Sequence, residues 1–341
     1  MELIAGDIGG TKSWLAWVVA SSQGMQTLRF EKVYASADFA SAEALLRQFI
    51  VDAQVDIPPD VLLLALPGAL QGQRTTLTNL DWMLDASVSR GTLGIAEVGF
   101  INDFQAAAAG VATLTADDVI ALNPQSPDAN GVRAITGAGT GLGLAFMLAD
   151  TSGHYQSYPS EGGHIDFAPA NAMQARLLDS LHAEYGHVSW ERVVSGSAMN
   201  DLYRFCCVEH NHTLPDVPID CAAVVALAGS GNGAAEAALD LFIDLYGSWV
   251  GNVALMVQPR GGLYIAGGVA GHLQSRMQSP RFMAAATDKG RMSGVVERTP
   301  IFMVNNNRLG VQGAIATALA GQQHALPENL NSNTAAIRSG T

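Results

Sequence analysis

Cysteine is scarce in this sequence: the 341 residues include three, Cys206, Cys207 and Cys221. Their spacing is not that of a zinc ligand set, and an odd number with two adjacent members makes a poor disulfide framework. We therefore expect reduced cysteines, as in a cytoplasmic protein.

Positive charge is also scarce. Charged residues make up 14% of the chain, and 18 Lys and Arg stand against 31 Asp and Glu, which gives a formal net charge of −13. A chain this acidic is not expected to bind nucleic acid or an anionic membrane through bulk electrostatic attraction. A nucleotide is still compatible with the charge, because a local loop of backbone N–H groups can hold phosphate on an acidic protein.

Long apolar runs are absent, although 48% of the residues are hydrophobic. No window reaches the roughly 18 uncharged apolar residues of a membrane helix. We expect no signal peptide, because an apolar strand begins at Glu2 and runs into a polar glycine turn. Length and apolar content suit two globular domains with buried cores.

The N-terminal segment is the most informative part of the chain. An apolar strand at residues 2–7 leads into Asp-Ile-Gly-Gly-Thr, and a second apolar strand follows at residues 14–20, which predicts a hairpin. Adjacent glycines let an anion approach the backbone, and successive N–H groups with the Thr11 hydroxyl form an anion-binding nest. Asp7 is placed to hold a hydrated Mg²⁺. The alternative is an ordinary glycine turn.

Residues 132–148 repeat this pattern, with Gly-Ala-Gly-Thr-Gly-Leu-Gly at 137–143 between two apolar strands. We interpret the repeat as a weak internal duplication that gives two related domains, each with a phosphate-binding hairpin. A tight β-turn is the alternative. Gly267 and Gly268 follow a third apolar strand at residues 263–266, where they would admit a flat ring or a ribose; a plain strand-to-helix turn fits equally well.

The remaining chain alternates between strand and helix patterns, which indicates a mixed α/β sheet protein. Further strands are expected at residues 28–34, 61–66 and 98–101, helices at 40–53, 172–209, 234–256 and 310–320, and a short helix or turn at 86–94.

Polar residues between apolar segments supply candidate chemistry. Asp103 follows a strand and precedes an alanine-rich helix, so it is either a helix N-cap or a base for a substrate hydroxyl, with Asn102 beside it to donate and accept. Glu161 and His164 flank two glycines and suit a polyhydroxylated substrate better than a metal. Glu191 adds a carboxylate whose alternative role is helix capping. Hydroxyl acceptors together with phosphate loops predict phosphoryl transfer.

These segments together resemble the bacterial glucokinase family, sugar kinases of the actin-like ATPase fold. The resemblance runs from about Gly6 to Ala320 and includes, in order, Gly-Asp-Ile-Gly-Gly-Thr, Ile-Asn-Asp-Phe, Gly-Ala-Gly-Thr-Gly-Leu-Gly, Glu-Gly-Gly-His-Ile-Asp-Phe-Ala-Pro and Ile-Ala-Gly-Gly. It implies an α/β fold with a cleft between a small domain (residues 1–110 and 308–324) and a large domain (111–307), followed by a loose tail (325–341).

The resemblance also implies ATP-dependent phosphorylation of glucose at the 6-hydroxyl, with ATP and Mg²⁺, by a homodimer. It makes Asp103 the catalytic base and assigns the other sugar contacts to Asn79, Asn102, Glu161, His164 and Glu191. It places Asp7 at the Mg²⁺–phosphate end, Gly9, Gly10 and Thr11 in the first phosphate loop, Gly137, Thr140 and Gly141 in the second, and Gly267 and Gly268 against adenosine.

The sequence departs from the family pattern at several positions. Ser160 and Lys12 stand where glycine and asparagine are frequent, and Ser-Gly-Ser-Ala at residues 195–198 stands where Ser-Gly-Pro-Gly is frequent. The cysteine-rich zinc motif of related repressors and kinases is missing, so we predict no structural zinc. Two alternatives follow: a glucose-binding sensor with little turnover, and a kinase for another hexose, since an epimer is distinguished by small shifts of hydroxyl-binding side chains.

Overall fold

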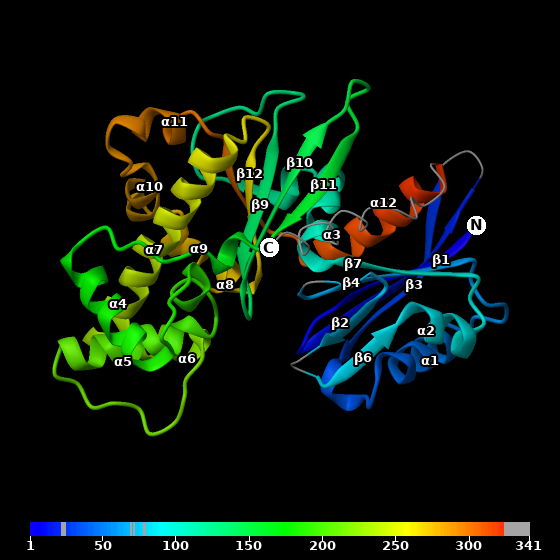
Figure 1. The fold of residues 1–341 in the computed structure, drawn as a ribbon, viewed down its shortest axis with the longest axis horizontal. Helices are drawn as coiled ribbons and strands as arrows, with labels where there is room; N and C mark the ends of the chain where they lie inside the picture. The colour runs from blue at the N-terminus through cyan, green and yellow to red at the C-terminus, as the bar shows by residue number, and fades with distance from the viewer. Residues whose placement is uncertain (22–24, 69, 71, 78–79, 324–341) are drawn as a thin grey trace, which may run out of the picture. The chain divides into compact units, whose positions relative to one another are not determined.

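The computed structural model describes residues 1–21, 25–68, 70, 72–77 and 80–323. The chain divides into two compact units, one formed by Met1–Thr113 with the C-terminal segment from Asn307 and the other by Leu114–Asn306. Each unit has its own mixed sheet with helices (Figure 1). The predicted α/β class is confirmed, and the predicted tail at 325–341 lies outside the described residues. Every helix in the described ranges is too short or too polar to span a bilayer.

The first unit is built around a five-stranded sheet. Its strands are β1 (Glu2–Ile8), β2 (Lys12–Ala20), β3 (Gln26–Ala35), β4 (Val61–Leu66) and β7 (Glu97–Asn102). Across the sheet the order is β3-β2-β1-β4-β7; β2 is antiparallel to β1 and β3, whereas β4 is parallel to β1 and β7. The predicted N-terminal hairpin is confirmed, because β1 and β2 pair as far as Ile8 and Ser13.

Helices cover both faces of this sheet (Figure 1). α1 (Ala42–Asp52) and α2 (Ala86–Leu93) bury one face, while α3 (Asp103–Gly110) and α12 (Leu309–Gln323) bury the other. β4 is buried along its whole length because successive side chains enter opposite cores, Leu62 and Leu64 on one side and Val61 and Leu63 on the other. The unit also contains the short helices η1 (Ser36–Asp38) and η2 (Val111–Thr113) and the hairpin strands β5 (Arg74–Leu77) and β6 (Trp82–Asp85).

The second unit is built around a six-stranded sheet. Its strands are β8 (Val119–Ala121), β9 (Arg133–Ala138), β10 (Leu142–Ala149), β11 (Tyr155–Ser160), β12 (Leu263–Ala266) and β13 (Ile301–Val304). The order β11-β10-β9-β12-β13 repeats the directions of the first sheet: two antiparallel pairings followed by two parallel ones, with β8 added antiparallel at the edge. The topology therefore agrees with the predicted internal duplication.

The central helix of this unit is α7 (Gly233–Val257), which α5 (Ala198–Glu209), α6 (Cys221–Gly229) and α10 (Pro280–Thr287) pack against. The other helices are α4 (Ala172–Tyr185), α8 (Gly268–His272), α9 (Gln274–Met277), α11 (Ser293–Glu297), η3 (Ala116–Asp118), η4 (Gly162–His164), η5 (Trp190–Arg192) and η6 (Gly290–Met292).

Most predicted elements are confirmed within a few residues, but the single helical region predicted over 172–209 is wrong in its middle. α4 stops at Tyr185, and Gly186 follows with a φ of 74°. The chain then runs beside residues 165–167, where the Phe167 N–H donates to the Val188 carbonyl at 2.9 Å. The helix pattern resumes only at Ala198.

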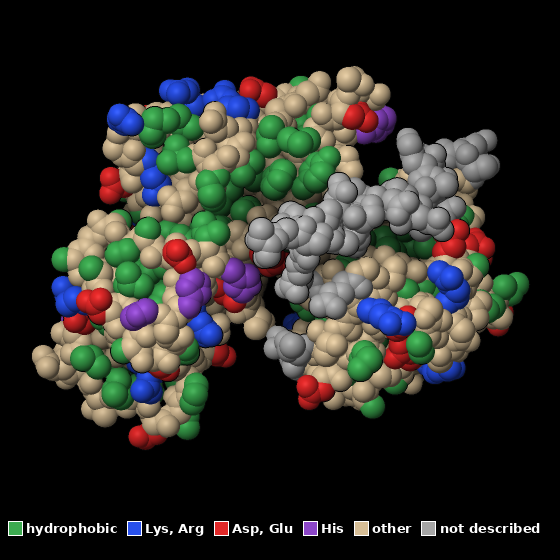
Figure 2. Space-filling view, in the orientation of Figure 1, with side chains coloured by type: hydrophobic (Ala, Val, Ile, Leu, Met, Phe, Trp, Pro, Cys, Tyr) green, Lys and Arg blue, Asp and Glu red, His purple; other side chains and the backbone are tan. Residues whose placement is uncertain are grey.

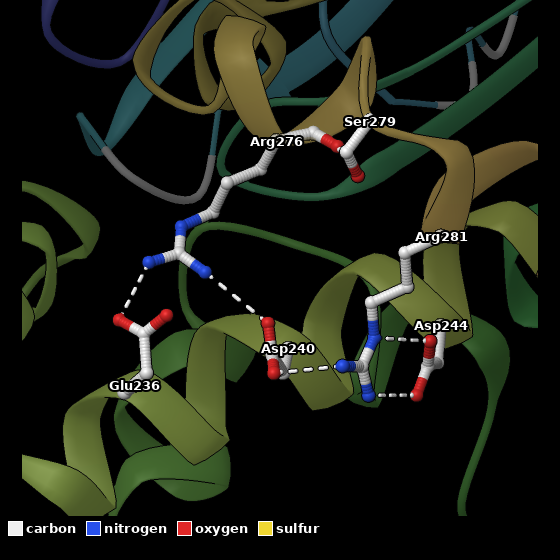
Figure 3. Close-up of polar contacts among 6 residues, drawn as sticks. All are labelled: Glu236, Asp240, Asp244, Arg276, Ser279 and Arg281. Atoms are coloured by element: carbon white, nitrogen blue, oxygen red, sulfur yellow. Dashed lines mark hydrogen bonds and ion pairs between the residues drawn. The ribbon is translucent and has the colours of Figure 1, made fainter.

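A ladder of ion pairs fastens α9 and α10 to one face of α7 (Figure 3). Arg276 donates to Glu236 at 2.7 Å and to Asp240 at 3.2 Å, and Arg281 donates to Asp240 at 2.7 Å and to both oxygens of Asp244 at 2.7 Å. The three carboxylates recur every fourth residue, so they lie along one side of the helix.

We expect Arg281→Ala to lower the free energy of unfolding by about 1 kcal/mol, since its guanidinium holds two carboxylates in a partly exposed network. The loss should shrink in about 1 M salt, where exposed ion pairs are screened. Urea denaturation at low and high salt measures both. Arg74→Ala is the control, because Arg74 is more exposed and pairs with Asp85; an equal loss in the two variants would contradict the assignment.

Candidate functional site

The first glycine loop, Gly9–Thr11, joins β1 to β2 and is fastened by η1. The Ser36 hydroxyl donates to the Gly9 carbonyl at 2.7 Å, and the Ser36 N–H donates to the Thr11 carbonyl at 3.1 Å. The Gly9 N–H donates across the loop to the Lys12 carbonyl at 2.9 Å. No sequence motif marked Ser36, which comes from a segment remote from the loop.

Asp7 lies near the end of β1, against the first turn of α12. A side chain at Gly310 would overlap the Asp7 carboxylate, so this glycine makes the room that the carboxylate occupies. Burial raises the pKa of Asp7 to about 6. Within the described residues no group of three or more His, Cys, Asp or Glu could hold a metal ion. A cation here would therefore take one protein carboxylate and complete its shell with water or ligand oxygens, which is the usual manner of Mg²⁺.

Asn102 and Asp103 lie at the junction of β7 and α3. Asn102 is the N-cap: its side-chain oxygen accepts from the Gln105 N–H at 3.0 Å, and its amide donates to the Gly68 carbonyl at 3.1 Å. The capping role considered for Asp103 thus belongs to its neighbour. Asp103 is the first helical residue, where it accepts from the Phe104 N–H at 2.8 Å. The helix N-terminus favours its ionised form.

The parallel strands explain why these residues share one end of the first unit. Asp7 pairs with Ala65 of β4, and Ala65 pairs with Ile101 of β7. Because parallel strands end at the same edge of a sheet, the glycine loop after β1 and the Asn-Asp pair after β7 leave the sheet at the same edge.

The second glycine loop lies at the corresponding edge of the second unit's own sheet, where the parallel strands β9 and β12 end. A side chain at Gly137 would overlap the Ala266 carbonyl, and one at Gly267 would overlap the Ala138 carbonyl, so β9 and β12 approach closely because both positions are glycine. Gly267 also has a φ of 96°, which favours glycine. The loop after β9 and Gly267–Gly268 after β12 are therefore neighbours.

Helix α7 supports this loop from beneath. The Ala138 N–H donates to the Tyr246 hydroxyl at 3.1 Å, and the Trp249 indole donates to the Thr136 hydroxyl at 2.9 Å. Burial raises the pKa of Tyr246 above its usual value. Both side chains are fully buried. The helix pattern predicted α7 but gave no sign that these two residues reach the loop.

The predicted hydroxyl-binding residues of the second unit are brought together. His164 lies 3.9 Å from the Glu161 carboxylate through Nε2 and 3.9 Å from the Glu191 carboxylate through Nδ1. The other Glu191 oxygen accepts from the Leu142 N–H at 2.9 Å. A side chain at Gly141 would overlap this carboxylate. Glu191 therefore joins the hydroxyl-binding cluster directly to the end of the second glycine loop rather than capping a helix.

Pairing between two segments builds this cluster. The Trp190 N–H donates to the Ile165 carbonyl at 3.0 Å, and the Trp190 ring stands edge-on to Phe167 with centroids 5.1 Å apart. The buried aromatic contact holds Glu191 beside His164. The His164 and Glu161 side chains remain 58% and 63% exposed, so they are open to a ligand.

The departures at residues 195–198 make local hydrogen bonds. The Ser195 hydroxyl accepts from the N–H of Ala198, the first residue of α5, at 3.1 Å, while Ser197 donates to the Thr140 carbonyl at 3.2 Å. The Gly196 N–H donates to the Gly139 carbonyl at 2.8 Å. The segment 195–198 is therefore held against the second glycine loop by these hydrogen bonds, although it lacks the proline that is frequent in the family. Ser160 likewise accepts from the Gly162 N–H at 3.1 Å.

A cavity of about 440 Å³ opens beside this segment, within the second unit. Its lining includes Ser197 and Asn200, the apolar Pro218 and Ile219, and the charged Arg192, Asp201 and Asp220. The cavity therefore has both polar and apolar lining, as a small-molecule site does. Of the predicted residues, Asn79 lies outside the described residues, and the others fall into the two sets given above, one in each unit.

Comparisons with known proteins agree with these observations. The sequence model of a family described as Glucokinase matches residues 4–321. A glucokinase of Nostoc punctiforme is 36% identical over 338 residues, covering 93% of this chain and 98% of the relative. The structure of a glucokinase from an Antarctic psychrotroph is 30% identical with a TM-score of 0.80, covering 94% of this chain and 99% of that one. A glucokinase of Balamuthia mandrillaris in complex with glucose, at 21% identity and a TM-score of 0.77 over 93% of each chain, shares the fold.

The pKa of Asp7 gives a stability prediction. Since the folded value of about 6 lies above the ordinary 3.8, ionisation opposes folding, and stability is lost as the pH rises through this range. Asp7→Asn should therefore raise the free energy of unfolding at about pH 8 by up to ~3 kcal/mol and have little effect at about pH 4. Thermal denaturation without added ligand or metal tests this. The exposed Asp38 is the control; an equal gain in Asp38→Asn, or a loss in Asp7→Asn, would refute it.

Proposed function

The chain belongs to the glucokinase family, and from that premise we propose that Asp103 is the general base with which it transfers the terminal phosphoryl group of ATP to the 6-hydroxyl of glucose. Glu161, His164 and Glu191 bind the sugar, and the two glycine loops bind the phosphates. The observation that carries the proposal is the position of Glu191. Its carboxylate bonds the Leu142 N–H at 2.9 Å at the end of a glycine loop and lies 3.9 Å from His164. Side chains that can accept from sugar hydroxyls and backbone N–H groups that can donate to phosphate thus lie next to each other within the second unit.

The sugar-binding assignment rests on hydrogen-bonding chemistry. A hexose presents several hydroxyl donors, and ionised Glu161 and Glu191 are acceptors, while His164 offers both a donor and an acceptor when neutral. One oxygen of Glu191 is fixed by the Leu142 N–H, which orients the other. Asn102 has its oxygen committed to capping α3 and one amide hydrogen committed to Gly68, so it would contribute its second amide hydrogen.

ATP binding is supported by features of both units. The two glycine loops present backbone N–H groups at the carboxyl edges of their sheets, where anions bind in α/β proteins. The cavity between Gly196 and Ile219 lies beside the second loop and has the size and polarity of a nucleoside site. Asp7 suits a hydrated Mg²⁺, since its carboxylate is buried and a bound cation would favour the ionised form; the ion would neutralise phosphate charge.

Asp103 would accept the proton of the 6-hydroxyl as the oxygen bonds to phosphorus and the bond to ADP breaks. A carboxylate suits this role when it stays ionised and lies within reach of the hydroxyl. The α3 N-terminus and the bond from the Phe104 N–H stabilise the ionised form. The alternative of a sensor with little turnover was motivated by residues 195–198, and their hydrogen bonds to the second loop remove that motive.

A homodimer and a cytoplasmic location complete the proposal. The homodimer rests on the family resemblance, and sedimentation of the purified protein tests it. The location rests on the cysteines, all three of which are buried and free of disulfide bonds.

Asp103→Asn should lower kcat by at least about 100-fold, because the variant cannot accept the proton, while glucose affinity stays near normal. ADP release is measured with Mg-ATP against glucose, mannose, fructose, galactose and N-acetylglucosamine, and glucose binding by calorimetry. Asp117→Asn, at an exposed position, is the matched control. Full turnover in Asp103→Asn would refute the assigned base, and a stronger response to another sugar would change the substrate.

Gly141→Ala should raise the KM for glucose about tenfold, because the new methyl group displaces the Glu191 carboxylate from the Leu142 N–H. Gly139→Ala is a close control in the same loop, since a side chain there meets nothing within 4 Å. Steady-state kinetics with each substrate varied distinguishes the two. Equal changes in both variants would contradict a role for Glu191 in sugar binding.

A further inference from the structure

Two buried serines form a chain of hydrogen bonds behind the first glycine loop. Ser13 of β2 and Ser36 of η1 are both 0% exposed, and their hydroxyl oxygens lie 2.9 Å apart. The Ser36 hydroxyl donates its hydrogen to the Gly9 carbonyl at 2.7 Å. A hydroxyl has one hydrogen, so the hydrogen between the two serines comes from Ser13. The chain runs from Ser13 through Ser36 to the Gly9 carbonyl.

This chain fixes the orientation of the peptide between the two loop glycines. In a planar trans peptide the carbonyl and the N–H point in opposite directions. Because Ser36 holds the Gly9 carbonyl, the Gly10 N–H points away from η1. In the part of the chain that the structure describes, the Gly10 N–H has no hydrogen-bond acceptor. The second bond, from the Ser36 N–H to the Thr11 carbonyl at 3.1 Å, holds the other end of the loop in the same way.

We propose that Ser36, supported by Ser13, is a positioning residue that turns the Gly10 N–H toward a phosphate of ATP. The proposal deepens the proposed function and rests on the first glycine loop being a phosphate loop. Without the hydroxyl, the Gly9 carbonyl loses its donor, and rotation of the peptide would present an oxygen to the anion in place of an N–H. Of the residues that we assign to ligands, Ser36 hydrogen-bonds only Gly9 and Thr11 of the first loop, so its effect should fall on ATP and spare glucose.

Ser36→Ala should raise the KM for ATP about five- to tenfold, as expected for one misdirected hydrogen bond, and leave the KM for glucose unchanged. Ser13→Ala removes the bond into Ser36 but leaves the bond to Gly9, so it should change the KM for ATP in the same direction by less. Kinetics with each substrate varied and denaturation midpoints are measured on all variants.

Ser89→Ala is the matched control. Ser89 belongs to the same unit, is 2% exposed and donates to the Glu43 carboxylate at 3.0 Å. Its loss should lower the denaturation midpoint without altering either KM. The proposal is overturned if Ser36→Ala and Ser89→Ala lower the midpoint alike and both keep the KM for ATP within about twofold of the unchanged protein.

The design separates this proposal from the proposed function. ADP release by the unchanged protein with glucose tests the function, whereas the comparison of serine variants tests the positioning role of Ser36 and Ser13. Should Ser36→Ala not fold, Ser13→Ala decides, because it retains the Ser36 bond to the Gly9 carbonyl. An unchanged KM for ATP in Ser13→Ala would then overturn the proposal that the two serines together position the Gly10 N–H.

Discussion

The two glycine loops depend on one constraint: each backbone carbonyl that turns inward needs a donor. In the first unit Ser36 supplies the donors for Gly9 and Thr11, and in the second the 196–197 segment supplies them for Gly139 and Thr140. Once the carbonyls are held, the planar peptide directs the intervening N–H groups the opposite way. The direction of these N–H groups is therefore set by hydrogen bonds made on the opposite side of each loop.

The repeated topology places a glycine loop at the same position in both sheets. In each sheet an antiparallel hairpin is followed by a parallel neighbour, β4 beside β1 and β12 beside β9. Parallel neighbours end at a common edge, so residues after the second strand are delivered next to the glycine loop of the first. Gly267 reaches the second loop in this manner, and the Asn-Asp pair after β7 reaches the edge of the first.

The sequence predicted the features that local patterns encode. The N-terminal hairpin, β4, α7 and α12 follow from period and turn residues, and the confirmed strand ends explain why Asp103 could be singled out. The helix predicted across residues 186–197 failed because an apolar pattern does not reveal pairing with a distant segment such as 165–167. Ser36 was missed for a related reason: a serine after a strand carries no signal, and its importance arises from a contact made 27 residues away in sequence.

Asp7 illustrates how a site and a stable fold oppose one another. Its ionised carboxylate is half-enclosed beside α12, and burial raises its pKa to about 6, so at neutral pH the fold holds a charge that water would solvate better. A bound cation would offset this cost. Gly310 leaves the space that the Asp7 carboxylate occupies, although a residue with a side chain would favour the helix. A residue chosen only for stability would be uncharged at position 7 and larger at position 310. Both choices run against folding, and the role proposed for Asp7 at the phosphate end of the site would account for them.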